Sequence, residues 1–140
     1  MRNFVAVFVG GLVGTAARFG VDALFPHEVS EPGWSTIIVN VIGSFALGLL
    51  TGTLWKRETT PAWLKAGLGA GVLGSFTTFS AVALGTSVAA MSGNIETAII
   101  DLGFSLIWGL LAAVLGIFCG TKFFHNPRQG SVIADEGVDL

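Results

Sequence analysis

The chain has 140 residues, of which 52% are hydrophobic and only 11% are charged, and its formal net charge is −2. So few charges cannot cover the surface of a soluble domain of this size, which argues against a water-soluble protein. Acidic residues slightly outnumber basic ones, whereas proteins that bind nucleic acid usually carry an excess of Lys and Arg, so the composition gives no support for nucleic acid as a partner. The 20 glycines are instead typical of closely packed transmembrane helices.

Four segments are long and apolar enough to cross a bilayer, because a hydrocarbon core of about 30 Å needs about 20 helical residues. In chain order, the predicted spans are Phe4–Phe25, Trp34–Trp55, Trp63–Met91 and Ala98–Phe118. Turn-forming residues separate the spans, and tryptophans lie at several of their ends. The predicted fold is therefore an all-α integral membrane domain of four transmembrane helices at residues 1–124, followed by a disordered cytoplasmic tail at 125–140.

The first span also looks like a signal peptide, with Thr15–Ala17 as a candidate cleavage site. We expect the span to be retained, because apolar sequence continues past Arg18 and three further spans follow. Gly11, Thr15, Arg18 and Asp22 place polar groups on one face of this helix. Two interpretations of Arg18 stay open here: its side chain reaches the membrane surface, or it takes part in function.

Polar or small residues recur every fourth position in the second and fourth spans. They are Thr36, Asn40 and Ser44 in the second span and Asp101, Ser105 and Gly109 in the fourth. For an isolated Ser or Thr, helix packing is the simpler interpretation, as it is for Gly116-xxx-Gly120 and for Cys119 in its apolar run. Asn40 differs, because its own helix cannot satisfy an amide that brings two N–H donors to mid-membrane.

The third span holds the most informative feature of the chain. Its uncharged stretch, Ala66–Met91, would be about 39 Å long as a straight helix, which exceeds the hydrocarbon core. At its centre lies the run Gly-Ser-Phe-Thr-Thr-Phe-Ser, residues 74–80, with four hydroxyl side chains. This run predicts a break in the helix at Gly74–Thr78, where freed carbonyl groups suit a fixed hard cation such as Na⁺. The interior stripes offer donors and no acidic residue at mid-depth, so they favour a small hydrated anion as the transported species.

The positive charges are distributed unevenly about the membrane. Six of the seven Lys and Arg residues fall on the N-terminal side, namely Arg2, Lys56, Arg57, Lys65, Lys122 and Arg128. The loops on the other side carry Glu28, Glu31 and Glu96 instead. The positive-inside rule therefore predicts a multi-pass protein of the cell membrane with both termini in the cytoplasm and one strongly preferred orientation.

Three motifs, in this order, resemble those of the Fluc (CrcB) family of fluoride channels over about residues 4–120. They are Gly10-Gly11-xx-Gly14-xxx-Arg18, then Val39-Asn40-xx-Gly43-Ser44-Phe45, then Gly71-xx-Gly74 with the run to Ser80. The resemblance implies an antiparallel dual-topology dimer whose third helices are broken, with two fluoride pores along the interface. It also implies passive export of fluoride that entered the cell as HF.

The resemblance further assigns roles to individual residues. The backbone carbonyls of Gly74 and Thr77 match the ligands of a structural Na⁺ at the dimer centre. The positions that match the pore lining or its entrance are Asn40, Phe79, Ser80, Ser105, Thr36 and Arg18.

The chain departs from the family pattern at two positions. Val82 stands where the second pore phenylalanine belongs, and Asp101 stands where a tyrosine is common. A carboxylate beside an anion path repels the anion unless it is protonated or paired. Together with the strong orientation bias, Val82 leads to the hypothesis of a heterodimer with a homologous chain of opposite orientation, with a homodimer as the alternative.

Three other functions each require a sequence feature that can be checked against this chain. A small four-helix multidrug/proton antiporter needs a membrane-embedded Glu in its first span, where only Asp22 is available, near the outer end. An intramembrane serine protease needs a base beside its nucleophile, and both histidines, His27 and His125, are expected in loops. A purely structural subunit does not need a broken third span.

Overall fold

The structure is a computed structural model that describes residues 1–26 and 32–123. The tail predicted at 125–140 lies outside the described residues, as do the two histidines, Arg128 and two acidic residues of the first loop.

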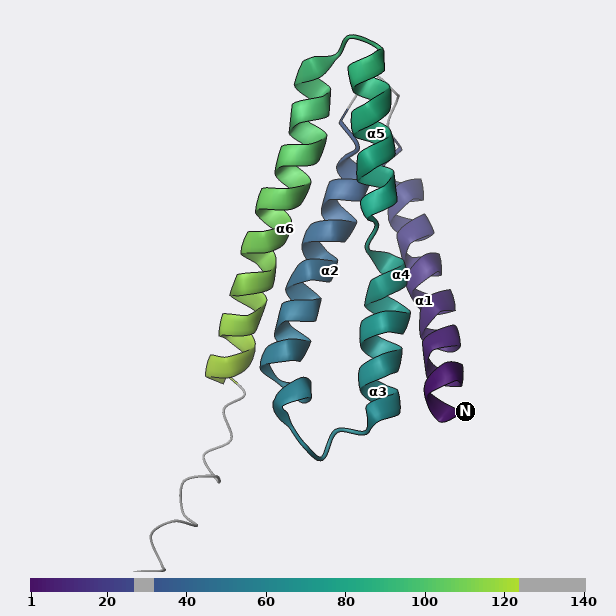
Figure 1. Ribbon diagram of the computed structural model, residues 1–140, viewed down its shortest axis with the longest axis vertical. Helices are drawn as coiled ribbons and strands as arrows, with labels where there is room; N and C mark the ends of the chain where they lie inside the picture. Colours follow the sequence, from purple (N-terminus) through teal and green to yellow (C-terminus); the bar gives the residue numbers. More distant parts are fainter. Residues whose placement is uncertain (27–31, 124–140) are drawn as a thin grey trace, which may run out of the picture.

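The described chain is all-helical (Figure 1). Its elements are α1 (Arg2–Leu24), α2 (Trp34–Gly52), the short 3₁₀ turn η1 (Leu54–Lys56), α3 (Ala62–Ala66), the π-helical segment η2 (Gly67–Leu73), α4 (Gly74–Phe76), α5 (Phe79–Met91) and α6 (Ile95–Phe123). Helices α3, η2, α4 and α5 follow one another as a single interrupted rod, so the described chain forms four rods. Each rod is long and apolar enough to cross a membrane.

The four predicted spans are therefore confirmed as helices, although the fourth is longer than predicted. It begins at Ile95 rather than Ala98 and continues to Phe123 rather than Phe118. At its start, the side chain of Asn94 accepts a hydrogen bond from the Thr97 N–H at 3.3 Å. Such an N-cap fixes where a helix begins, and a hydropathy window does not detect it.

The third rod is broken within the predicted window. Thr77 (φ −75°, ψ 153°) and Thr78 (φ −149°, ψ 119°) both have extended backbone conformations, whereas Gly74 is still helical. The helix restarts because the Thr78 hydroxyl accepts the Ala81 N–H at 3.2 Å, which caps α5. Upstream, the π-helical turns of η2 widen the backbone, a distortion that is frequent at functional sites.

Glycines set how closely the rods approach. The most extensive contacts are between α2 and α6 and between α1 and η2. A Cβ added at Gly14 would collide with the Val72 carbonyl of η2, and one added at Gly116 would collide with the Phe45 carbonyl of α2. These positions confirm that small residues serve backbone-to-backbone packing in this bundle.

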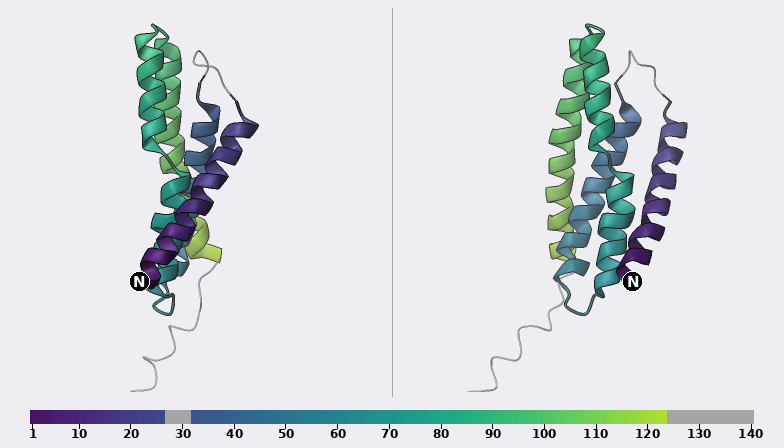
Figure 2. Two further views of the ribbon diagram at one scale, coloured as in Figure 1. Left: turned by 90° about the vertical axis from the view of Figure 1, so that its right-hand side faces the viewer. Right: turned by 45° about the vertical axis from the view of Figure 1, so that its right-hand side comes forward.

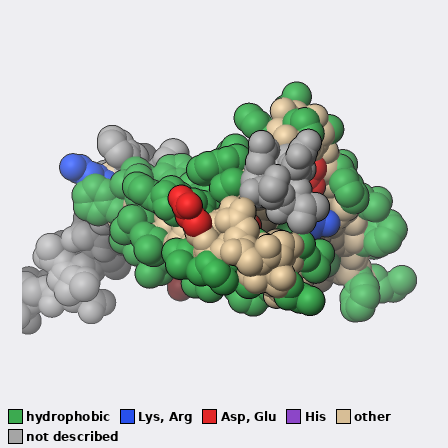
Figure 3. Space-filling model, turned by 90° about the horizontal axis from the view of Figure 1, so that it is seen from above, with side chains coloured by type: hydrophobic (Ala, Val, Ile, Leu, Met, Phe, Trp, Pro, Cys, Tyr) green, Lys and Arg blue, Asp and Glu red, His purple; other side chains and the backbone are tan. Residues whose placement is uncertain are grey.

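Apolar side chains cover the outside of the bundle. Among the residues that the structure describes, only a few hydrophobic ones are buried, whereas large ones such as Phe4, at 86% exposure, and Leu110, at 68%, are exposed. Figure 3, seen from the end that carries the α5–α6 turn, shows hydrophobic side chains around most of the perimeter. This distribution is what a lipid-facing protein requires and is the reverse of a soluble fold.

The rods alternate in direction. The N-terminus, the η1–α3 connection and the end of α6 lie at one end of the molecule, and the α5–α6 turn lies at the other (Figures 1 and 2). The first end carries the basic residues of the described chain other than Arg18, namely Arg2, Lys56, Arg57, Lys65 and Lys122. The structure thus keeps the charge asymmetry that the sequence predicts.

Candidate functional site

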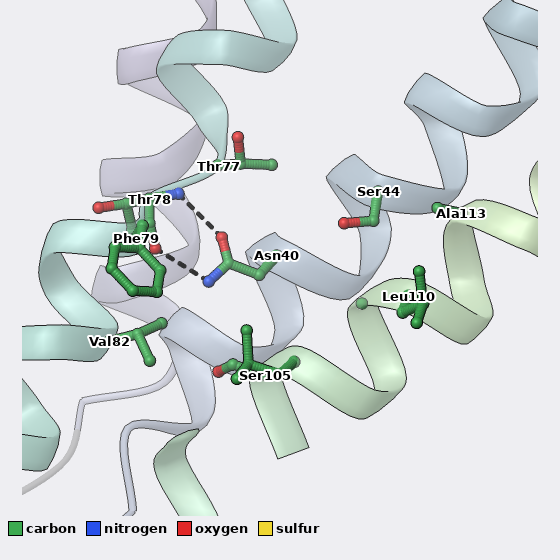
Figure 4. A pocket seen from close by; sticks show the side chains of 11 residues that line it. Asn40, Ser44, Thr77, Thr78, Phe79, Val82, Ser105, Leu110 and Ala113 are labelled. Atoms are coloured by element: carbon green, nitrogen blue, oxygen red, sulfur yellow. Dashed lines mark hydrogen bonds between the residues drawn. The ribbon is translucent and has the colours of Figure 1, made fainter. Parts of the chain in front are cut away.

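A cavity of about 400 Å³ lies beside the break in the third rod. Its walls come from α2, α5 and α6 and from the broken segment, as Figure 4 shows. The lining residues are Asn40, Ser44, Thr77, Thr78, Phe79, Val82, Ser105, Leu106, Gly109, Leu110 and Ala113. Asn40, Thr77 and Thr78 bring polar groups to the break, and Ser44 and Ser105 add two hydroxyls from α2 and α6, while the other lining residues are glycine or apolar.

Asn40 and Thr78 form the best-defined contact of the site. The Asn40 Nδ2 donates to the Thr78 carbonyl at 3.0 Å, and the Thr78 N–H donates to the Asn40 Oδ1 at 2.8 Å (Figure 4). Thr78 is buried and Asn40 is half-buried. The amide therefore finds its partner in the third rod and not in its own helix, which satisfies a group that is costly to leave unpaired in a membrane.

The break leaves carbonyl groups without their helical donors. In a continuous helix, the Thr78 N–H would bond to the Gly74 carbonyl, and the Ala81 N–H would bond to the Thr77 carbonyl. These two N–H groups bond instead to Asn40 and to the Thr78 hydroxyl. Among the described residues, no hydrogen bond reaches the carbonyl of Gly74 or Thr77. Such oxygens need a water or a cation in an apolar setting, so they fit a hard cation.

Phe79 and Ser80 begin α5 on its outer side. Phe79 is 68% exposed and also borders the cavity, and Ser80 is exposed. The Ser80 hydroxyl lies 3.1 Å from that of Thr78, so the two form a polar pair beside the aromatic ring. In this single chain, both side chains are also exposed on the side away from the rest of the cavity wall, so they are only partly covered.

Ser105 is a buried hydroxyl that lines the cavity from α6. It is 7% exposed, and its Oγ has no hydrogen-bond partner among the described residues. Buried polar groups without partners are uncommon, and each one calls for a ligand, a water or an ion. Ser105 therefore brings to the wall of the cavity a buried hydroxyl whose partner the described chain does not supply.

Asp101 lies one helical turn from Ser105, and its carboxylate is engaged. It is 5% exposed, and its Oδ1 accepts the N–H of Gly33 at 2.7 Å, immediately before α2. The start of a helix carries a partial positive charge that stabilises an anionic side chain. The carboxylate is thus held by a backbone donor at the start of α2, and Asp101 is not one of the residues that line the cavity.

Arg18 and Thr36 do not line the cavity. Arg18 is half-buried in the C-terminal half of α1, with its guanidinium 5.8 Å from the Phe19 ring centroid. A role at a pore entrance stays a prediction for both residues. The described residues contain no group of three or more His, Cys, Asp and Glu side chains that could hold a metal.

Thr78 is the residue that the sequence predictions undervalued. Its backbone binds Asn40, its hydroxyl caps α5, and its side chain lines the cavity. A threonine directly before an apolar helical stretch is an N-cap signal, and that signal marks Thr78 in the sequence.

The chain is similar to known proteins over most of its length. Residues 5–117 match the family model described as CrcB-like protein, Camphor Resistance (CrcB). The chain is 36% identical over 123 residues to the fluoride-specific ion channel FluC of Hydrogenovibrio crunogenus, covering 87% of this chain and 93% of that protein. It is 37% identical over 130 residues to FluC 2 of Halalkalibacterium halodurans, covering 92% of this chain and 93% of that one.

FluC of Hyphomonas neptunium is 36% identical over 126 residues, which cover 89% of this chain and 99% of that protein. The match runs through all four rods and through the broken segment that borders the cavity. The chain therefore belongs to the CrcB/FluC family of membrane channels for fluoride, a family of channels and not of enzymes.

Proposed function

We propose that this protein is a fluoride-selective channel that exports cytoplasmic fluoride passively across the cell membrane. The observation that carries the proposal is the cavity beside the broken third rod, which Asn40 of α2, Phe79 of α5 and Ser105 of α6 border in a chain of the fluoride-channel family. Both termini lie in the cytoplasm, because the basic residues gather at the end of the molecule that holds the N-terminus.

The chemistry of the cavity suits a small, strongly hydrated anion. Fluoride gives up water only where fixed donors replace it, and the unpaired Ser105 hydroxyl is one such donor. The positive edge of the Phe79 ring is a second, weaker one. In this proposal Ser80 continues the polar path on the exposed side, and Arg18 and Thr36 act near its entrance.

The functional unit in this proposal is an antiparallel dimer of two homologous chains. Phe79 is 68% exposed although it borders the cavity, so a second chain is needed to close the fluoride path on that side. The polar pair formed by Ser80 and Thr78 lies on the same side. Two pores would then run along the dimer interface.

A structural Na⁺ is proposed at the dimer centre, held by the carbonyls of Gly74 and Thr77. These are oxygens that the break leaves without hydrogen bonds among the described residues. When bound, Na⁺ supplies a fixed positive charge that joins the two broken rods. The carbonyls of Gly74 and Thr77 would hold it in place, so in this proposal it would be structural and would not be transported.

The proposed partner is a homologous chain of opposite orientation. An antiparallel homodimer requires each copy to insert both ways, whereas the charge asymmetry of this chain favours one orientation. Val82, which lines the cavity and is 3% exposed, offers an aliphatic group where the family pattern has phenylalanine. A partner chain would supply that ring for at least one pore.

Expression of this chain alone in a fluoride-sensitive host that lacks its own channel tests the partner. Little or no rescue is expected alone, and full rescue is expected with a homologous chain of reversed charge bias. Full rescue by the single chain would reject the heterodimer and leave the homodimer.

Fluoride flux from liposomes tests the function itself. Purified protein is reconstituted with its partner if one is needed, and external fluoride is followed with a selective electrode under a potassium gradient. Rapid fluoride efflux with no chloride efflux is expected. Transport of a cationic drug driven by a proton gradient, without fluoride flux, would instead support the antiporter.

A further inference from the structure

We propose that Asn40 is a positioning residue that holds the third rod in its broken form and thereby keeps the Gly74 carbonyl available for a cation. This inference rests on the proposed function, because Asn40 would then serve both the proposed cation site and the proposed fluoride path. It assigns to Asn40 a role beyond lining the cavity.

The geometry is a two-point contact between a side chain and the backbone of one residue. Oδ1 and Nδ2 of Asn40 bind the N–H and the carbonyl of Thr78 at 2.8 Å and 3.0 Å. Thr78 is 8% exposed, so water has little access to replace the amide. An asparagine side chain carries one acceptor and two donors in a single plane, and an extended residue presents its own two groups to match.

Asn40 competes directly with the helix for the Thr78 N–H. If the helix continued, that N–H would return to the Gly74 carbonyl, and this carbonyl would no longer be free. The β-branched side chains of Thr77 and Thr78 tolerate extended backbone well, but they do not replace a lost hydrogen bond. The amide does replace it, so the broken form depends on Asn40 more than on the threonines.

The same side chain also faces the cavity. Asn40 lines it, and the contact with Thr78 uses only one of the two Nδ2 hydrogens. The second N–H is left for a ligand in the cavity. Loss of Asn40 therefore removes a donor from the fluoride path. It also lets the Thr78 N–H bond to the Gly74 carbonyl, which is then no longer available to the proposed Na⁺.

The test compares Asn40→Ala, Asn40→Asp and, as a matched control on the same helix and cavity, Ser44→Ala. The full-length protein is labelled with ¹³C and ¹⁵N, and the Cα and Cβ chemical shifts of Thr78 report its backbone conformation. In Asn40→Ala these shifts are expected to move from values typical of extended backbone toward helical values. The hydrogen-exchange rate of the Thr78 amide is expected to differ from that of the wild type. Ser44→Ala is expected to leave both unchanged.

Asn40→Asp separates positioning from conduction. Its carboxylate loses the donor to the Thr78 carbonyl but keeps an acceptor for the Thr78 N–H, which is the contact that frees the Gly74 carbonyl, so the Thr78 shifts are expected to stay near extended values. Its negative charge faces the cavity, so fluoride flux is expected to be lost. If the Thr78 chemical shifts in Asn40→Ala still indicate extended backbone, the proposal is overturned, because the break would then form without the Asn40 side-chain amide.

A second measurement is thermal stability in sodium against N-methylglucamine. Sodium is expected to raise the melting temperature of the wild type and of Asn40→Asp, and this increase is expected to disappear in Asn40→Ala. If Asn40→Ala keeps the full increase, Asn40 does not control the cation site. If the wild type itself shows no increase, the Na⁺ proposal fails, while the Thr78 shifts still decide the positioning role.

Discussion

Thr78 is the residue through which the cavity, the break and the restart of the helix are connected. Its two backbone groups bind Asn40, and its hydroxyl accepts the Ala81 N–H and contacts the Ser80 hydroxyl. Asn40, Phe79 and Ser105 are among the residues assigned to the pore from the sequence, and they border one cavity. Their part in conduction is a prediction that mutants can test.

Phe79→Ile is expected to lower fluoride flux about five-fold or more, since loss of a ring-edge contact worth about 1 kcal/mol changes a rate by that factor. The measurement is fluoride efflux from liposomes. Phe8→Ile is the control, because Phe8 is also 68% exposed but lies on α1 and does not line the cavity. Equal flux in the two variants would argue against a pore role for Phe79.

Gly43 and Thr77 form a steric pair that supports the break. A Cβ added at Gly43 would collide with the Thr77 methyl group, so Gly43→Ala is expected to destabilise the fold by about 1–3 kcal/mol and to reduce flux. Thr77→Ser removes that methyl group and keeps the hydroxyl, which donates to the Leu73 carbonyl at 2.8 Å. Thr77→Ser alone is expected to be mild, because the proposed Na⁺ ligand is the backbone carbonyl.

The double variant Gly43→Ala/Thr77→Ser is expected to recover most of the lost stability and flux. Thermal unfolding in detergent and fluoride efflux measure the two effects. A double variant no better than Gly43→Ala would show that the clash is not with the Thr77 methyl group.

Among the helices, contact between backbones replaces the large side-chain core of a soluble protein. Lipid tails are as apolar as leucine, so burial of apolar surface does not drive helices together, and close van der Waals packing at small residues does. The glycines of α1, α2 and α6 that touch neighbouring backbones follow this rule. Their spacing in the sequence predicts which faces meet.

Two glycines of α6 provide a matched test of this packing. Gly116→Ala would place its Cβ against the backbone of α2 and is expected to cost about 1–3 kcal/mol of stability. Gly103→Ala meets nothing within 4 Å and is expected to be neutral or to stabilise the helix by up to about 1 kcal/mol. Both are measured by thermal unfolding in detergent, and equal effects would contradict the packing role.

At the scale of the whole molecule, the described basic residues other than Arg18 all lie at one end, and the described part of the other end has none. Because the four rods alternate in direction, the basic residues that the sequence scatters over three segments meet at a single end. Insertion of the reversed chain would carry these charges across the membrane, which is disfavoured. A single orientation is the expected consequence.

Cysteine labelling in intact cells tests this orientation. In a Cys119→Ser background, Ser92→Cys at the α5–α6 turn is expected to react with a membrane-impermeant maleimide from outside. Glu58→Cys, between η1 and α3, is expected to react only after the membrane is permeabilised. Equal labelling of both positions in intact cells would indicate dual topology and would favour a homodimer.

The sequence determined the class, the four spans, the charge asymmetry and the position of the break. These properties depend on local composition or on periodic spacing. Hydropathy predicts the membrane spans, the distribution of Lys and Arg predicts the orientation, and a run of hydroxyl side chains within an apolar span predicts a break in the helix. The tertiary structure decided which groups satisfy one another. Only folding brings Asn40 to Thr78 and Asp101 to the N–H of Gly33, because these hydrogen bonds join residues 38 and 68 positions apart. Distant partners of this kind leave no periodic signal in one chain, yet they decide that the amide supports the break and that the carboxylate is paired.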